Sequence, residues 1–436
     1  MMKLSLFQGI LLGFFALAAV VGVFVFATYQ NSGGSGADVG HVTIWGTLPK
    51  DQIDQVLVTA GQTNQAFNDV IYSQKTLATF DTDLISAIAE GRAPDLILIP
   101  QEYLLPLSKI LSVIPSASVS QRAFKDTFAA GGELYLSPTQ GGSYGIPLLV
   151  DPLVLFTNRS ILASNGIATV PATWEAVTGL VPKVAVKSPT GAISRSLIAL
   201  GTYANVRNAR GILSTLFLQA GVPMTTISTN GYRRADLGTS YQEGTPPGPA
   251  VARFYTQFAD PSKVSYTWNT SLPDSQQAFL LGDLALYLGY ASEATYLKDA
   301  NPNLDFDIAP VPQIATGSTK TTYGIIYSLA VPKSSPNPTG ATIVAAALSG
   351  LANDGLAASV THMAPADRDL LAAPPSDPIA AVAYSSALYA KGWLSPTPRD
   401  TDIVFSAMIN NVISGRLTLE AALTTAENAL SVLIQQ

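Results

Sequence analysis

One stretch about a third of the way along the chain constrains the fold most. Residues 141–152 begin with glycines, continue as the apolar run 146–150 and end at Asp151 and Pro152. Strand-like and helix-like patterns alternate before it, and a new strand pattern begins immediately after it. We therefore predict a strand that crosses between two lobes. A ligand cleft should lie beside it, because open α/β folds bind ligands where the chain changes direction in the sheet.

Length and composition agree with two lobes and exclude several kinds of function. A chain of 436 residues with 47% hydrophobic and 12% charged residues is too long for one ordinary core but has ample apolar surface for two. The net charge is −6 and no long basic run occurs, so we expect no nucleic acid partner. There is no cysteine, and the only histidines are His41 and His362. We therefore predict neither a metal site nor a cofactor.

The N-terminus carries a long apolar segment. Residues 9–27 contain no charged or strongly polar side chain, and Lys3 is the only flanking charge. The length predicts a transmembrane anchor over residues 4–29, with the bulk of the chain on the extracytoplasmic side. Residues 30–40, rich in glycine and serine, should form a flexible linker. A cleaved signal peptide is the alternative, because Ala16-Leu17-Ala18 resembles a small-residue cleavage site.

The order of patterns along the chain predicts an α/β fold. Strand patterns at 41–46, 69–72 and 94–100 alternate with helical spacing at 51–67 and 81–90, which indicates parallel strands. Thr173 is placed as a helix N-cap, and Gly91 as the residue that closes a helix. Residues 193–221 have two helical stretches, and 284–290 is a buried strand. A long β run at 322–331 is expected to cross back, and a helical tail follows from 379.

Six short segments, in order, resemble a known family. They are Ile44-Trp45; Ala89 to Leu96 with Gly91, Pro94 and Asp95; Tyr144 to Asn158; Pro171 to Glu175; Ala278 to Leu286; and Ser414 to Leu423. Together they resemble the extracellular solute-binding proteins of ABC transporters, in the sugar-binding, maltose-binding-protein-like branch. The lipid-attachment cysteine common in that family is missing, which favours the transmembrane anchor.

The resemblance implies both a fold and a function. The fold would be a two-lobed, periplasmic-binding-protein-like α/β structure, with lobe 1 formed by 41–147 and 324–378 and lobe 2 by 148–323 and 379–436. The function would be capture of a carbohydrate between the lobes, by hinge closure, and its delivery to the permease of an ABC importer. We expect a monomer that is not an enzyme, held at the outer face of the cell membrane.

Candidate ligand-binding residues are aromatic and polar side chains at the ends of the predicted strands. Aromatic faces cover the C–H patches of a sugar, and polar side chains bind its hydroxyl groups. Each candidate also has a plainer explanation in core packing, turn formation or surface polarity. The candidates are Trp45, Gln101, Glu102, Tyr144, Asp151, Trp268, Asn269, Tyr290, Tyr323 and Trp393.

Three other functions are left open by the sequence. Gly141-Gly142-Ser143-Tyr144-Gly145 matches the Gly-x-Ser-x-Gly pattern of serine hydrolases, although a β run follows it where a hydrolase needs a helix. The pair Glu102 and Glu133 would suit a glycosidase if the two carboxylates lay close together. An orphan receptor or structural protein that kept the fold and lost its cleft is the third alternative.

Overall fold

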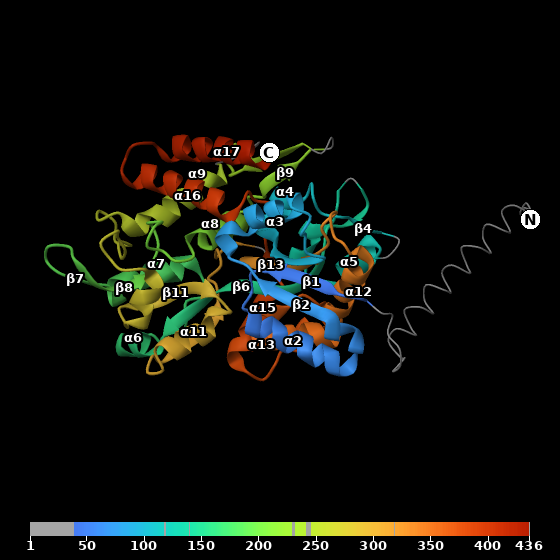
Figure 1. Cartoon of the computed structure of the whole chain (residues 1–436). Helices are drawn as coiled ribbons and strands as arrows, with labels where there is room; N and C mark the ends of the chain where they lie inside the picture. Colours follow the sequence, from blue (N-terminus) through green and yellow to red (C-terminus); the bar gives the residue numbers. More distant parts are fainter. Residues whose placement is uncertain are drawn as a thin grey trace, which may run out of the picture.

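Two groups of buried apolar side chains organise the computed structural model, which describes residues 39–116, 119–138, 140–228, 232–240, 246–317 and 319–435. The first core draws on residues 39–150 and 326–371, with Ala387 and Ala390. The second draws on 153–323 and 405–434, with Ala383 and Trp393. We call the parts around them the first and second lobes; they lie side by side in Figure 1. The lobe limits predicted from the sequence stay a prediction.

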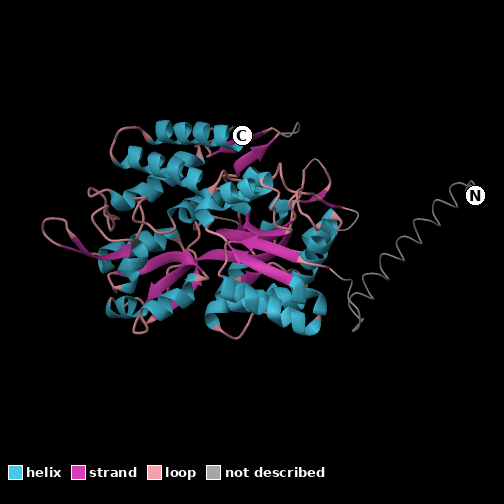
Figure 2. Cartoon of the chain, viewed as in Figure 1, coloured by secondary structure: helices cyan, strands magenta, loops and turns pink. Residues whose placement is uncertain are grey.

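One sheet runs through both lobes. The path through this 11-stranded sheet is β2-β1-β3-β13-β6-β11-β8-β7, with β12 and β14 pairing β6 and β15 pairing β13. Helices cover both of its faces (Figure 2). The strands are β1 (Val42–Gly46), β2 (Val70–Gln74), β3 (Leu96–Pro100), β4 (Ile114–Pro115), β5 (Gly142–Ser143), β6 (Ile146–Asn158), β7 (Val186–Lys187), β8 (Ile193–Ile198), β9 (Met224–Ile227), β10 (Arg233–Asp236), β11 (Leu284–Tyr290), β12 (Phe306–Pro310), β13 (Thr322–Ala330), β14 (Ala364–Pro365) and β15 (Ala390–Lys391).

The helices follow the expected α/β order. They are α2 (Lys50–Thr63), α3 (Phe80–Ala89), α4 (Leu104–Leu107), α5 (Gln121–Thr127), α6 (Arg159–Ser164), α7 (Trp174–Val184), α8 (Ala209–Gln219), α9 (Pro247–Thr256), α10 (Ser275–Leu280), α11 (Glu293–Ala300), α12 (Pro338–Leu348), α13 (Leu351–Thr361), α14 (Arg368–Leu371), α15 (Pro378–Ala387), α16 (Pro398–Ile413) and α17 (Leu419–Gln435). Two predicted boundaries are confirmed. Thr173 caps α7 by accepting from the Ala176 N–H, and Gly91, after α3, has φ +69°.

The predicted crossing strand and its return partner are both present. β6 and β13 lie antiparallel, with Asp151 opposite Ile325 and Pro152 opposite Gly324. Along β6 the side chains pass from the first core to the second between Val150 and Leu153. Along β13 the same change falls between Tyr323 and Ile326. Both strands therefore cross between the lobes at one level of the sheet.

Two predictions about local structure are wrong. Asp151-Pro152 does not end the strand, because β6 continues as one element of 13 residues. β6 changes partners at Pro152: the residues before it pair with β13, and those after it pair with β11 and β12. Pro152 has no N–H to donate, and it is tolerated because it lies at the boundary between these two sets of strand pairings. The first predicted helix of 193–221 is instead the strand β8, which pairs parallel with β11.

The predicted anchor and linker, residues 4–29 and 30–40, lie outside the described residues except for Val39 and Gly40. Within the described ranges, no single helix has both the length and the apolar composition to span a membrane. Taken together, α12 and α13 meet that test by length and composition alone, with a bend of 74° between them.

Candidate ligand-binding cleft

Strand ends from the first lobe and one helix from the second meet beside the crossing strands. β1 and β3 run parallel, so Trp45 and the residues after Pro100 reach the same edge of the sheet. β13 is antiparallel to β3, and its first residues start at that edge. The N-terminal end of α8 faces them from the second lobe, because Gly211 lets the helix approach Tyr290 and Tyr323 closely. A Cβ at Gly211 would lie 2.6 Å from Tyr290 Oη.

An ion-pair network occupies this junction. Arg210, in the first turn of α8, donates from Nε to Glu102 Oε1 at 2.8 Å and from Nη2 to Glu102 Oε2 at 3.4 Å. Its Nη1 donates to Asp402 Oδ2, on α16, at 2.6 Å. Tyr203 Oη donates to the other oxygen of Asp402 at 2.5 Å. One guanidinium therefore joins carboxylates from both lobes in charge-assisted bonds.

The degree of burial makes this network costly to break. The Glu102 side chain is 3% exposed and that of Arg210 is 17% exposed, whereas that of Asp402 is 43% exposed. Burial by itself would lower the pKa of Arg210, but the carboxylates of Glu102 and Asp402 outweigh it, and the pKa of Arg210 is raised. A buried charge of this kind is tolerated only when it is paired.

Gln101 and Tyr323, two predicted site residues, connect the ion-pair network to the crossing strand β13 by hydrogen bonds. Tyr323 Oη donates to Glu102 Oε1 at 2.8 Å. Gln101 Nε2 donates to Tyr323 Oη at 3.0 Å and to the Gly324 carbonyl at 3.2 Å, and its Oε1 accepts from the Ile326 N–H at 2.6 Å. Both side chains are fully buried. Their polar atoms thus hold β13 against the end of β3.

Tyr290, another predicted residue, is positioned by a buried carboxylate. Glu293 accepts from the Tyr290 N–H and from Asn208 Nδ2, both at 2.8 Å. Gln276 Nε2 and Tyr287 Oη donate to its second oxygen at 2.6 and 2.5 Å. Burial raises the pKa of Glu293, while these four bonds lower it. The half-buried Tyr290 is thereby held at the end of β11, facing α8.

A cavity of about 410 Å³ opens at the second-lobe side of the network. Its volume lies within the ~300–1,000 Å³ of small-ligand pockets. It has a polar and charged wall, formed by Tyr203, Ala204, Val206, Arg207, Asn208, Ala209, Arg210, Gly211, Asp274, Tyr290 and Asp402. No side-chain ion pair is found for Arg207 in the part of the chain that the structure describes. The wall can therefore offer both donors and acceptors to a bound molecule.

Asp151 lies on β6 where the strand leaves the first core. Its two oxygens accept from the Ser292 N–H at 3.1 Å and from Ser292 Oγ at 2.6 Å. The carboxyl is buried, and burial raises its pKa to about 7, although the bonds from Ser292 lower it. Asp151 thus ties the crossing strand to the start of α11.

The remaining predicted residues fall into two groups. Trp45 and Tyr144 are half-buried against the first core, and the ammonium of Lys75 lies 3.7 Å from the centroid of the Trp45 ring. Trp393 and Trp268 are buried in the second core. Trp393 Nε1 donates to Ser214 Oγ at 3.1 Å, and its ring stacks on Phe405. Asn269 Nδ2 donates to Tyr266 Oη at 2.7 Å.

The structure therefore brings Gln101, Glu102, Tyr290 and Tyr323 together, and it places Trp393 against the same helix, α8. Which of the ten candidates contacts a ligand stays a prediction. Arg210 and Asp402 were not among them. A lone arginine inside a helix and an aspartate near a helix start give no sequence signal of this kind. Only the structure shows them, because Arg210 meets Glu102 across 108 positions of the chain and Asp402 across 192.

The hydrolase pattern does not form a nucleophile elbow. Gly142 and Ser143 make the short strand β5, which pairs with β4, and the 13-residue strand β6 follows. Ser143 is buried at 5% exposure. An elbow requires a helix directly after the serine. The Gly-x-Ser-x-Gly match is therefore a coincidence of a glycine-rich turn.

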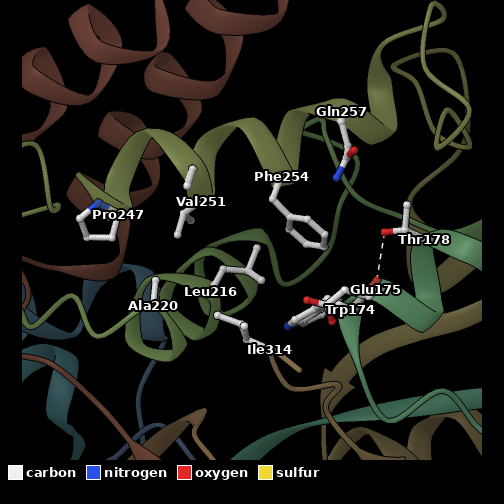
Figure 3. Close-up of a pocket in the computed structure, with 11 residues that line it drawn as sticks. Trp174, Glu175, Thr178, Leu216, Ala220, Pro247, Val251, Phe254, Gln257 and Ile314 are labelled. Atoms are coloured by element: carbon white, nitrogen blue, oxygen red, sulfur yellow. Dashed lines mark hydrogen bonds between the residues drawn. The ribbon is translucent and has the colours of Figure 1, made fainter. Parts of the chain in front are cut away.

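A second cavity lies within the second lobe, apart from the ion-pair network. It measures about 480 Å³ and is lined mainly by apolar side chains of α7, α8 and α9 (Figure 3). Trp174 and Phe254 meet there edge to face, with ring centroids 5.6 Å apart. The indole N–H of Trp174 is already used, donating to Gln219 Oε1 at 2.6 Å. This pocket offers few polar groups for recognising a polar ligand.

Comparisons with known proteins agree with the geometry. A family model described as bacterial extracellular solute-binding protein matches residues 50–350. Curated binding proteins of Brucella abortus and Brucella suis are 24% identical over 263 residues, which is 58% of this chain and 58% of each relative. The matched region thus spans less than two thirds of those relatives.

Solved structures match over nearly the whole chain. A cyclo/maltodextrin-binding protein complexed with maltotetraose is 16% identical, with a TM-score of 0.71, covering 93% of this chain and 99% of that one. A cyclic alpha-maltosyl-1,6-maltose binding protein from Arthrobacter globiformis is also 16% identical, with a TM-score of 0.72, covering 91% and 99%. These likenesses establish the two-lobed α/β fold. With more than half of its 436 residues matched by the family model, the chain belongs to the bacterial extracellular solute-binding protein family.

Proposed function

We propose that this protein captures a carbohydrate in the cleft between its lobes and delivers it to an ABC importer. The observation that carries the proposal is the polar cavity of about 410 Å³ beside the crossing strands. Its wall combines two arginines, two aspartates and two tyrosines, and Glu102 lies across the junction. Carboxylate and guanidinium groups can bind vicinal hydroxyl groups in pairs, and a tyrosine ring can cover a sugar face.

Similar structures support this ligand class. The matched proteins include complexes with maltotetraose and maltotriose, and each shares the fold over about nine tenths of this chain or more. We infer that the ligand leaves unchanged. The chain belongs to a family of binding proteins, and Ser143 lies in a strand that does not present it as a nucleophile.

We further propose that residues 4–29 anchor the protein to the membrane and that residues 30–40 tether the lobes to it. The proposal rests on the uninterrupted apolar run at 9–27 and on the absence of a cysteine for lipid attachment. The partner would be an ABC permease, which receives the ligand from a monomeric protein outside the membrane.

Ligand retention and titration test the proposal. The natively purified protein is examined by mass spectrometry for a retained saccharide, and calorimetry then measures binding of neutral mono- and oligosaccharides, with amino acids as non-sugar ligands. Asp402→Asn and Tyr290→Ala should each weaken saccharide binding by roughly tenfold or more, because each removes a group lining the cavity. Tyr296→Ala is the matched control, since that tyrosine is exposed on α11. Binding of amino acids in place of saccharides would refute the carbohydrate assignment.

A further inference from the structure

The pair Glu102–Arg210 is the point where charge joins the two lobes. Glu102 is followed by Tyr103 and Leu104 of the first core, whereas Arg210 follows Ala209 and precedes Gly211 and Ile212, with Ala209 and Ile212 in the second core. All other ion pairs given for the described ranges connect residues of the same lobe. This pair is also the most buried of them.

We propose that the Glu102–Arg210 pair is a latch that holds the lobes together before any ligand arrives. This deepens the proposed function by naming what regulates closure of the same cleft. The latch is bidentate, and Asp402 orients the guanidinium from behind at 2.6 Å. Asp402 and Arg210 both belong to the second lobe, so when the lobes separate Arg210 keeps one carboxylate partner and loses the other.

The latch is asymmetric in a way that favours reversible opening. Once parted, Arg210 remains paired with the more exposed Asp402, and solvent can reach it there. Glu102 also accepts from Tyr323 Oη, but Tyr323 is buried in the second core and its N–H donates to Thr215 Oγ1 of α8, so this bond also spans the junction. Opening admits water to Glu102 while Arg210 keeps Asp402, so neither charge is left both buried and unpaired, which is the arrangement that costs most. The open form is therefore accessible, and the Glu102–Arg210 bonds that opening breaks favour the closed form.

A favoured closed form changes the apparent affinity. The measured dissociation constant equals the intrinsic constant divided by the fraction of protein already in the binding-competent form. If removing the latch lowers that fraction to about one tenth, affinity falls roughly tenfold without loss of any ligand contact. Glu102→Gln is the least disruptive change, because it keeps the shape and the ability to accept from Tyr323 while removing the charge.

The chain has no cysteine, so a distance across the cleft can be measured directly. Ile85 on α3 of the first lobe and Val432 on α17 of the second are exposed, at 55% and 60%. Both are replaced by cysteine and spin-labelled, and the distance distribution is recorded by double electron–electron resonance without ligand. Asp305→Asn is the matched control, because Asp305 pairs with Arg159 at the surface of the second lobe alone.

The latch predicts one dominant short distance in the unliganded parent and in Asp305→Asn, and a shift toward longer distances in Glu102→Gln. Arg210→Lys, which keeps the charge but loses the planar fork that bonds Glu102 through two nitrogens, should give an intermediate shift. Circular dichroism and thermal unfolding confirm that each variant is folded. An unchanged distribution in both folded variants would overturn the proposal and make the pair a fixed part of the hinge. Because no ligand is added, either result is independent of whether the protein binds saccharides.

Discussion

Asp151 should make the stability of this protein fall as pH rises from the acidic range to neutrality. Burial raises its pKa from 3.8 to about 7 in the folded protein. The folded state therefore holds this proton more tightly than the unfolded chain does. The resulting stabilisation is fully present below about pH 4 and is lost as the pH rises through about 7.

The magnitude follows from the two pKa values. The full effect between a pKa of 3.8 and one of about 7 corresponds to about 4 kcal/mol. Between about pH 5 and about pH 8 the loss should be about 3 kcal/mol. Asp151→Asn should remove this pH dependence, because an amide stays neutral and its oxygen still accepts from the Ser292 N–H.

Urea unfolding of the parent and of Asp151→Asn across this pH range provides the test. Other buried acids, such as Glu293 with its raised pKa, contribute equally to both proteins, so the difference between the two curves isolates Asp151. Asp305→Asn, at an exposed carboxylate, serves as the control and should follow the parent. Parallel curves for the parent and Asp151→Asn would refute the argument, since they would show that Asp151 ionises in the folded protein as it does in the unfolded chain.

Three further predictions concern the same junction. Gln101→Ala should lower the free energy of unfolding by about 2–4 kcal/mol in urea titrations. The three buried hydrogen bonds from Gln101 to β13 contribute about 1 kcal/mol each, and their loss leaves buried partners unsatisfied. The control Gln55→Ala, at an exposed position, should change it by less than about 0.5 kcal/mol. Trp393→Ala should lower the free energy of unfolding by about 3–5 kcal/mol, because the ring is buried against Phe405. Trp45→Ala should lower it by less, because Trp45 is only half-buried; equal losses would contradict this. Calorimetry should find glucuronic acid binding roughly tenfold more weakly than glucose, because Asp274 and Asp402 in the cavity wall, with Glu102 paired to Arg210 next to it, outnumber the two arginines of the wall. Tighter binding of the acid would show that Arg207 dominates.

The sequence allowed prediction of the elements whose pattern is local. The uninterrupted apolar runs of β3 and β11 indicated buried strands, and the glycine-led run at 146–150 indicated the crossing. The Ile193–Ile198 segment was assigned to a helix because its isolated pattern does not show that β11 lies beside it. Pairing with a distant strand overrides such weak local preference.

The site was predictable only where a strand end placed a polar residue. Gln101 and Glu102 directly follow β3, so their position at the sheet edge could be inferred. The direction in which an aromatic side chain points could not be inferred from the sequence. Trp393 lies in the second core and Tyr290 lines the cavity, although both are aromatic residues beside a glycine. Arg210 could not be predicted as part of the junction, because its partners Glu102 and Asp402 are distant in the sequence and meet it only in the folded chain.

We propose that one atom, Glu102 Oε1, couples ligand binding to the movement of the lobes. Glu102 Oε1 accepts from Arg210 Nε on the second lobe and from Tyr323 Oη on the crossing strand, both at 2.8 Å. A sugar hydroxyl that donated to this oxygen would compete with both bonds at once, altering the lobe contact and the hold on β13 together. Ligand binding and lobe closure would then be coupled directly, without a change in the packing of the core. The coupling would arise because the Glu102 carboxylate accepts either from the protein donors or from the ligand. The strength of a ligand's bond to Glu102, relative to that of Arg210, would set how far binding shifts the lobes.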